Sequence, residues 1–153
     1  MTYALIINEV LADPPEGLAG DANRDGQYDP HEDEFIELYN IGPVPISLAG
    51  WRLGDAGSLS GYFRFPADAV IEPSSYVVLF GGGDPTEFTI PVYTDDGTIG
   101  DGLNDSGESI HLRSSPISRG PTINPSSALH PIAVLMSRTK PSRRPRPPSH
   151  PDT

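Results

Sequence analysis

Short apolar stretches separated by turn residues are the feature that most limits what this chain can fold into. Each stretch is four to seven residues long and rich in β-branched or aromatic side chains, which favours strands. No amphipathic pattern of helical length lies between the stretches. The chain also holds 16 glycines and 18 prolines, a content that suits frequent turns and opposes long helices. The pattern therefore predicts an all-β fold, either an antiparallel sandwich or a barrel.

Two of the predicted strands stand out. Residues 34–40 alternate, with Ile36 and Leu38 on one face and Phe35, Glu37 and Tyr39 on the other. Residues 75–80 are the most apolar stretch and end at three consecutive glycines at 81–83, which we interpret as a flexible turn. The full set of predicted strands covers residues 3–9, 34–40, 44–48, 50–54, 62–65, 75–80 and 109–113.

The character of the chain changes near residue 114. Residues 1–113 hold 20 of the 21 acidic residues and only four arginines, a balance of −16, whereas residues 114–153 carry six basic residues and one acid, a balance of +5. Half of the prolines also lie beyond residue 114. We therefore predict a β-sandwich domain over residues 1–113 and a tail over 114–153 that is mostly disordered, with one further strand possible at 132–136.

Several chemistries and locations are excluded or narrowed by composition. The chain has no cysteine, so it has no disulfide, no thiolate zinc site and no cysteine nucleophile. No run of 18 apolar residues is present, so no membrane span is expected. The first ten residues lack the basic and apolar regions of a signal peptide. Either the protein is cytoplasmic or its export signal is not part of this chain.

A set of segments recurs in a recognisable order along the chain: Ile6–Val10, Glu34–Asn40, Ile46–Leu53, Phe65–Pro66, Ile71–Pro73, Tyr76–Leu79, Leu103–Glu108 and Ile110–Leu112. Their order resembles the lamin tail domain family, in particular its bacterial type. The resemblance covers about residues 5–113 and implies an immunoglobulin-like sandwich that attaches to a protein or a surface and is not catalytic. It also implies a secreted or envelope protein, since bacterial domains of this kind occur there, often beside hydrolase domains. Pro116 and Pro121 interrupt the family's usual closing strand, which is therefore missing, displaced to residues 132–136 or lost to truncation.

The sharpest chemical signal is a twelve-residue acidic motif within the loop of residues 14–33. The motif DANRDGQYDPHE, residues 21–32, fits the calcium loop of EF-hand and dockerin proteins. Ca²⁺ takes six to eight oxygen ligands, and Gly26 would allow the sharp turn that the loop needs. The flanks are strand-like and not helical, so the loop would be an insertion between two strands; the alternative is a solvated acidic loop without a metal. The predicted calcium ligands are Asp21, Asn23, Asp25, Gln27 through its backbone carbonyl, Asp29 and Glu32.

The other polar groups favour structural roles. Asn8, Glu9, Glu37 and Asn40 are interpreted as strand-end groups that satisfy loop donors, not as a catalytic carboxylate pair. Trp51 is predicted to lie in the sandwich core. The four histidines show no zinc-binding spacing, and no nucleophile elbow or phosphate loop is present.

These observations predict a non-catalytic binding or adaptor module that is stabilised by calcium and attaches to a protein or cell-surface partner. The expected location is extracellular or in the cell envelope, with the cytoplasm as the alternative. Two other functions stay open. The chain could be an accessory domain of a secreted nuclease or hydrolase, or it could contact DNA or chromatin through the basic residues Lys140 to Arg146 of its tail.

Overall fold

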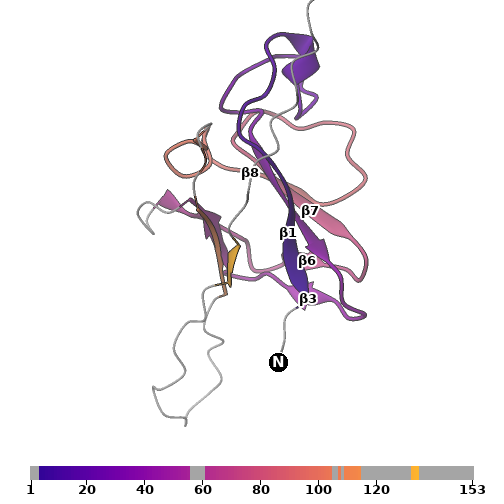
Figure 1. The fold of residues 1–153 in the computed structure, drawn as a ribbon. Helices are drawn as coiled ribbons and strands as arrows, with labels where there is room; N and C mark the ends of the chain where they lie inside the picture. Colours follow the sequence, from indigo (N-terminus) through magenta and orange to yellow (C-terminus); the bar gives the residue numbers. More distant parts are fainter. Residues whose placement is uncertain (1–3, 56–60, 105–106, 108, 115–131, 135–153) are drawn as a thin grey trace, which may run out of the picture.

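The computed structural model describes residues 4–55, 61–104, 107, 109–114 and 132–134, the last three for their backbone only. These residues form an all-β immunoglobulin-like sandwich, in which the described part of the chain has two four-stranded sheets, a two-stranded ribbon and one 3-10 turn (Figure 1). The elements are β1 (Leu5–Leu11), η1 (Leu18–Gly20), β2 (Phe35–Asn40), β3 (Ile46–Ser47), β4 (Arg52–Gly54), β5 (Phe63–Arg64), β6 (Val70–Ile71), β7 (Tyr76–Phe80), β8 (Val92–Thr94), β9 (Ile110–Arg113) and β10 (Ile132–Val134).

The strands form two layers. The first sheet has the order β1-β2-β7-β8, the second sheet has the order β10-β9-β4-β5, and β3 pairs with β6 in the ribbon. The pairs between described strands are antiparallel except β7 with β8, which run parallel. The predicted antiparallel sandwich is therefore confirmed, and β8 is added in parallel at one edge. The segment 81–91 carries the chain from the end of β7 back to the start of β8, as a parallel pair requires.

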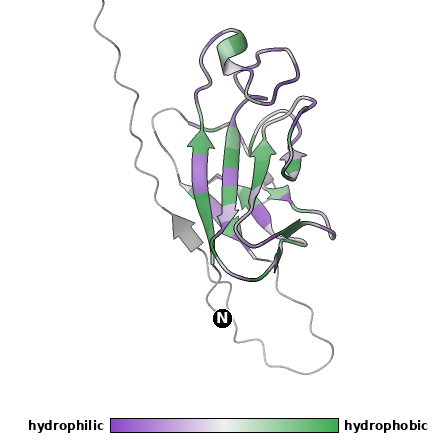
Figure 2. Ribbon diagram, turned by 90° about the vertical axis from the view of Figure 1, so that its right-hand side faces the viewer, coloured by the Kyte–Doolittle hydropathy of each residue, from purple (hydrophilic) through white to green (hydrophobic). Residues whose placement is uncertain are grey.

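The core lies between the two sheets. In β2 the alternation predicted from the sequence is confirmed, because Ile36 and Leu38 are fully buried while their neighbours are partly exposed. They face Leu53 of β4 and Leu112 of β9 within one apolar cluster. Figure 2 shows hydrophobic and hydrophilic bands alternating along the strands. Trp51 is 5% exposed and belongs to this cluster, which confirms its predicted place in the core.

A second, smaller apolar cluster lies on the other face of the first sheet. Phe35 and Phe80 are register partners on β2 and β7, and their rings meet edge to face at 5.6 Å. Phe80 also contacts Phe88, which follows β7 in the chain, at 5.5 Å between ring centroids. The segment after β7 thus covers one end of this face.

The structure differs from the predicted strands mainly in their ends. The first strand continues to Leu11, beyond the predicted end at residue 9, and the strands predicted at 44–48 and 62–65 shrink to β3 and β5. Strands β6 and β8 were not predicted, because two or three residues are too few to show a period. The structure places β10 within the range 132–136, paired with β9. The rest of the predicted disordered tail, apart from residue 114, lies outside the described residues.

The polar groups at the strand ends have structural partners. Asn40 is completely buried; its side-chain amide donates to the backbone oxygens of Val44 at 2.8 Å and Ile71 at 3.1 Å, and its Oδ1 accepts from the N–H of Gly42. Asn8 donates to Glu37 at 2.7 Å on the exposed face of the first sheet. Asn40 therefore fixes the turn between β2 and β3 against β6.

Candidate functional site

The acidic loop connects β1 to β2 at one end of the sandwich. Because β7 runs antiparallel to β2, the end of β7 and the glycine turn that follows it lie at this same end. Figure 1 shows the loop, with η1 at its tip, beside the segment that follows β7. Residues far apart in the sequence therefore meet at the predicted calcium loop.

The first half of the predicted loop is folded around its own side-chain oxygens. Asp21 accepts hydrogen bonds from the N–H groups of Asp25 at 3.1 Å and Gly26 at 3.0 Å. Asn23 Oδ1 accepts from Asp25 at 3.0 Å, and Asp25 Oδ1 accepts from Gln27 at 2.9 Å. Gly26 has a φ of 90°, which other residues rarely adopt, so the glycine predicted for the sharp turn is at the position that needs it. Three predicted ligands thus line one tight turn.

The second half of the predicted loop is arranged differently. Asp29 Oδ1 accepts from the N–H groups of His31 at 2.9 Å and Glu32 at 3.1 Å, and these hydrogen bonds lower the pKa of the Asp29 carboxyl. A methyl group added at Gly82 would lie 2.9 Å from the Glu32 side chain, so that side chain lies against the glycine turn. Among the residues that the structure describes, no three His, Cys, Asp or Glu side chains are grouped closely enough to hold a metal ion. The six predicted ligands are therefore neighbours in one loop and do not form a closed coordination shell.

Asp33 is the residue on which the loop is organised, and the sequence analysis missed it. Its side chain is completely buried. Oδ1 accepts from the N–H groups of Ala22 at 2.8 Å and Asn23 at 3.1 Å, and Oδ2 accepts from Asp29 at 2.9 Å. Its position in the sequence could have identified it, because a carboxylate that follows the motif and directly precedes an apolar strand is suited to accept hydrogen bonds from loop N–H groups.

The loop docks on the glycine turn by close approach of two backbones. The N–H of Gly81 donates to the backbone oxygen of Glu34 at 2.9 Å, and the N–H of Gly82 donates to the backbone oxygen of Glu32 at 3.2 Å. A methyl group at Gly81 would lie only 2.0 Å from the oxygen of His31. Gly81 and Gly82 are buried, so the turn was misinterpreted as simply flexible: these glycines leave room for the neighbouring loop.

A third set of contacts joins Arg24 to the segment after β7. The Arg24 guanidinium lies 4.9 Å from the centre of the Phe88 ring, and the Arg24 oxygen accepts from the hydroxyl of Thr86 at 2.5 Å. The N–H of Thr86 donates to the oxygen of Asn23 at 3.2 Å. Arg24 itself has a φ of 62°, so the loop backbone is held in an uncommon conformation by these partners.

Residues 2–123 match the family model described as Lamin Tail Domain. The chain belongs to the lamin tail domain family. A search of curated proteins finds no relative that matches the chain. Lamin tail domains are immunoglobulin-like domains that often mediate protein interactions, and the family is not a known catalytic one. The match extends ten residues beyond the predicted domain boundary at 113.

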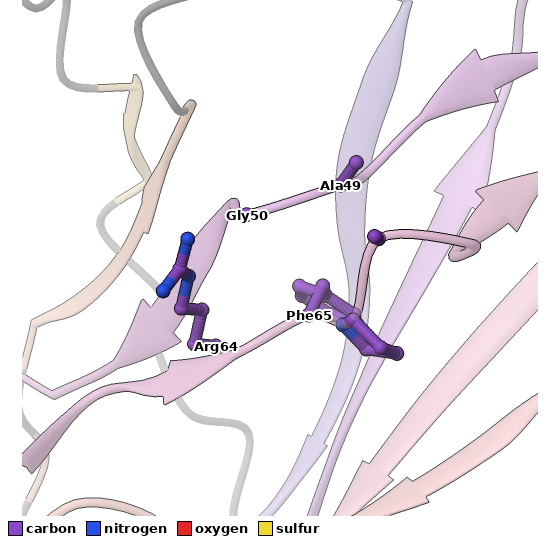
Figure 3. Close-up of a pocket in the computed structure, with 6 residues that line it drawn as sticks. Ala49, Gly50, Arg64 and Phe65 are labelled. Atoms are coloured by element: carbon purple, nitrogen blue, oxygen red, sulfur yellow. The ribbon is translucent and has the colours of Figure 1, made fainter.

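A concave feature of this lamin tail domain lies on the side of the second sheet. A pocket of about 480 Å³ is lined by Ala49, Gly50, Arg64, Phe65, Pro66 and Ala67 (Figure 3). Arg64 contributes its charge and the other residues contribute mainly apolar surface. No helix of this lamin tail domain, within the described ranges, is long and apolar enough to cross a membrane.

Proposed function

We propose that this lamin tail domain is a non-catalytic binding or adaptor module, stabilised by calcium at the loop of residues 21–32, that attaches to a protein or cell-surface partner. The proposal places the module outside the cell or in the cell envelope, where calcium is abundant enough to fill a weak site. The proposed ligands are Asp21, Asn23, Asp25, the Gln27 carbonyl, Asp29 and Glu32.

One observation carries the calcium part of the proposal. Asp21, Asn23 and Asp25 direct their oxygens to backbone N–H groups on one turn that Gly26 makes possible. Each of these oxygens accepts one backbone hydrogen bond, and the set supplies the hard oxygen donors that Ca²⁺ prefers. The carboxylates of Asp21 and Asp25 repel each other, and a divalent cation would remove that cost.

The same geometry limits the affinity. Since no three acidic side chains are already grouped among the described residues, calcium would have to draw in Asp29 and Glu32 from their present contacts. That rearrangement reduces the net free energy of binding. We therefore expect a Kd of roughly 10⁻⁴–10⁻³ M, the range of extracellular calcium modules.

Calorimetric titration with CaCl₂, with thermal melts of the same samples in EDTA and in calcium, tests the proposal. Calcium that binds only the folded state stabilises it by about 2.7 kcal/mol at a hundredfold excess over Kd. Glu32→Gln should remove most of the calcium-dependent rise in Tm. Glu72→Gln is the matched control, since Glu72 is exposed and precedes β7, at the opposite end of the sandwich from the loop. A wild-type melt that is identical in EDTA and in several millimolar calcium would contradict the proposal.

Binding of a partner is tested separately from binding of calcium. The wild-type protein, immobilised through its N-terminus, should retain a partner from an extracellular extract, and an excess of competing soluble domain should abolish that retention. A catalytic role would instead appear as turnover of a nucleic acid, ester or peptide that copurifies with the folded protein and is lost on a point substitution.

A further inference from the structure

The outer face of the first sheet carries an apolar row at the end farthest from the acidic loop. Ile6 of β1 is the register partner of Tyr39 on β2, and Tyr39 is the register partner of Tyr76 on β7. Side chains at paired positions of neighbouring strands point to the same face of a sheet. Leu38, the neighbour of Tyr39, is buried in the core, so the row lies on the outer face. The tyrosine rings are stacked with their centres 4.5 Å apart, and Ile6 is 39% exposed.

Two carboxylates lie beside this row. Glu37 is two residues before Tyr39 on β2, so its side chain is on the same face, and Glu9 of β1 is its register partner. Like charges at paired positions of neighbouring strands destabilise a sheet. The amide of Asn8 donates to Glu37 at 2.7 Å, but it is uncharged. Among the described residues neither carboxylate forms an ion pair, so a cation bound here would stabilise the sheet.

The other end of the same face is already covered. Phe35 and Phe80 meet edge to face there, and Phe88 packs on Phe80 at 5.5 Å between ring centres. Figure 1 shows the segment after β7 beside the acidic loop, away from the start of β1. The open end of the face therefore combines two stacked tyrosines, an aliphatic side chain and two carboxylates.

This combination fits an extended segment that is rich in proline and arginine. Aromatic surfaces bind proline-rich segments, because such segments are already extended and lose little entropy on binding. An arginine can lay its aliphatic stem on an apolar side chain, place its guanidinium over a tyrosine ring and pair with a carboxylate. Its charge would also offset the repulsion between Glu9 and Glu37, which an acidic peptide or a nucleic acid would increase.

The chain itself contains a segment of this kind. Residues 143–148 have the sequence RRPRPP, with three arginines, three prolines and no acidic residue. Residues 1–113 carry a balance of −16 and residues 114–153 a balance of +5, so the domain and its tail attract each other.

The connection to the tail is long enough and starts on a suitable side. Phe63 of β5 and Tyr93 of β8 contact each other at 5.9 Å, so these edge strands of the two sheets face each other. The opposite edges, β10 and β1, therefore share the other side of the sandwich. From Val134, the end of β10, to Arg143 is nine residues, which span about 28 Å when extended. The sheets are about 10 Å apart and the seven residues of β1 span about 23 Å, so the segment can reach the row.

We propose that residues 143–148 of this chain bind the outer face of the first sheet, on the row of Ile6, Tyr39 and Tyr76, with their arginines at Glu9 and Glu37. The contact is intramolecular. A short connection gives the segment an effective concentration in the millimolar range, so a contact that is weak between separate molecules is populated within one chain. This inference goes beyond the proposed function and depends neither on calcium nor on an external partner.

The test is paramagnetic broadening of amide NMR signals in the full chain, recorded in EDTA. The chain has no cysteine, so Ser149→Cys provides a single attachment point for a nitroxide label beside the segment. We expect the signals of Ile6, Tyr39 and Tyr76 to lose most of their intensity in the oxidised sample relative to the reduced sample. The signal of Arg64, on β5 of the second sheet, should keep its intensity.

Two double variants, each made in the labelled protein, separate the site from net charge. Glu9→Gln with Glu37→Gln should restore most of the lost intensity, because it removes both carboxylates from the face. Glu16→Gln with Glu87→Gln removes the same charge from exposed positions in the acidic loop and in the segment after β7. This control should leave the broadening unchanged. Thermal melts verify that both double variants fold.

Each other outcome overturns the proposal. Equal recovery in the two double variants would mean that the tail responds only to net charge, and broadening confined to residues 21–32 would place it on the acidic loop. Signals that keep their intensity over the whole domain would mean that the segment does not bind. Broadening that also appears when labelled protein without ¹⁵N is mixed with unlabelled ¹⁵N protein would make the contact one between two copies of the chain.

Discussion

Replacing Asp33 with alanine should destabilise the domain more than any other single change in the acidic loop. The substitution removes a completely buried carboxylate that accepts from the N–H groups of Ala22, Asn23 and Asp29. Hydrogen bonds to charged groups contribute about 1.5–3 kcal/mol each, but removal of the carboxylate also removes its own desolvation cost, and water can reach some of the freed donors. We therefore expect a net loss of about 3–5 kcal/mol.

The loss should appear in the global melt because the loop is joined to the sandwich. Asp33 is the last residue of the turn 29–33 and lies just before β2. The N–H groups of Gly81 and Gly82 donate to the backbone oxygens of its neighbours Glu34 and Glu32. Trp51, buried in the core, supplies a fluorescence signal that reports the sandwich and not the loop alone. For a domain of this size a loss of 1 kcal/mol lowers Tm by roughly 4 °C, so Asp33→Ala should lower it by about 12–20 °C in EDTA.

Two variants frame this result. Asp68→Ala removes an exposed carboxylate and should change stability by less than about 0.5 kcal/mol. Asp33→Asn keeps one acceptor oxygen and should fall between the two. A shift in Tm below about 3 °C for Asp33→Ala would refute the reasoning, because it would mean that the loop can open without affecting the sandwich.

Three further predictions follow from other contacts. Gly81→Ala should lower Tm and detach the loop from β7, since its methyl group would lie 2.0 Å from the His31 oxygen, and faster amide exchange at positions 81 and 82 would measure the detachment. Leu53→Ala should cost about 2–5 kcal/mol in urea unfolding because it empties a completely buried core site, and a cost below 1 kcal/mol would show that the core collapses around the gap. Burial, with Asp96 nearby, raises the pKa of Asp95, so ionisation of Asp95 destabilises the fold. Asp95→Asn should therefore be more stable than the wild type at pH 7. Thermal melts across this pH range should show the difference in stability vanish as the pH falls below the unfolded-state pKa near 3.8.

The sequence predicted the parts of the fold that depend on period and composition. Ile36 and Leu38 show a clear alternation, and Trp51 is apolar and aromatic between two strands, so their burial followed from local pattern. Strands β6 and β8 could not be found, because their few residues are held by pairing with β3 and β7, which are distant in the chain. The parallel pairing of β8 likewise depends on where segment 81–91 leads, which no local pattern encodes.

The candidate site was predicted in a similar way. The oxygens of Asp21, Asn23 and Asp25 and the turn at Gly26 follow from a local motif, and the structure places them together. The roles of Gly81 and Gly82 depend on contacts between segments that are about 50 residues apart, so a motif search could not find them. Asp33 accepts from Ala22 and Asn23 within its own loop, but it lies outside the twelve-residue motif.

The pairing of β10 with β9 affects the order in which this protein can complete its fold. β9 ends at Arg113 and β10 begins at Ile132, so the ribosome must add about 20 residues before β9 can gain this partner. At about 5–20 residues per second this takes roughly one to four seconds, which is long compared with hairpin formation in microseconds. During that interval the backbone groups on the outer side of β9 are an open strand edge on which another nascent chain can pair. Crowded polysomes should therefore be the setting in which this domain is most prone to misassembly.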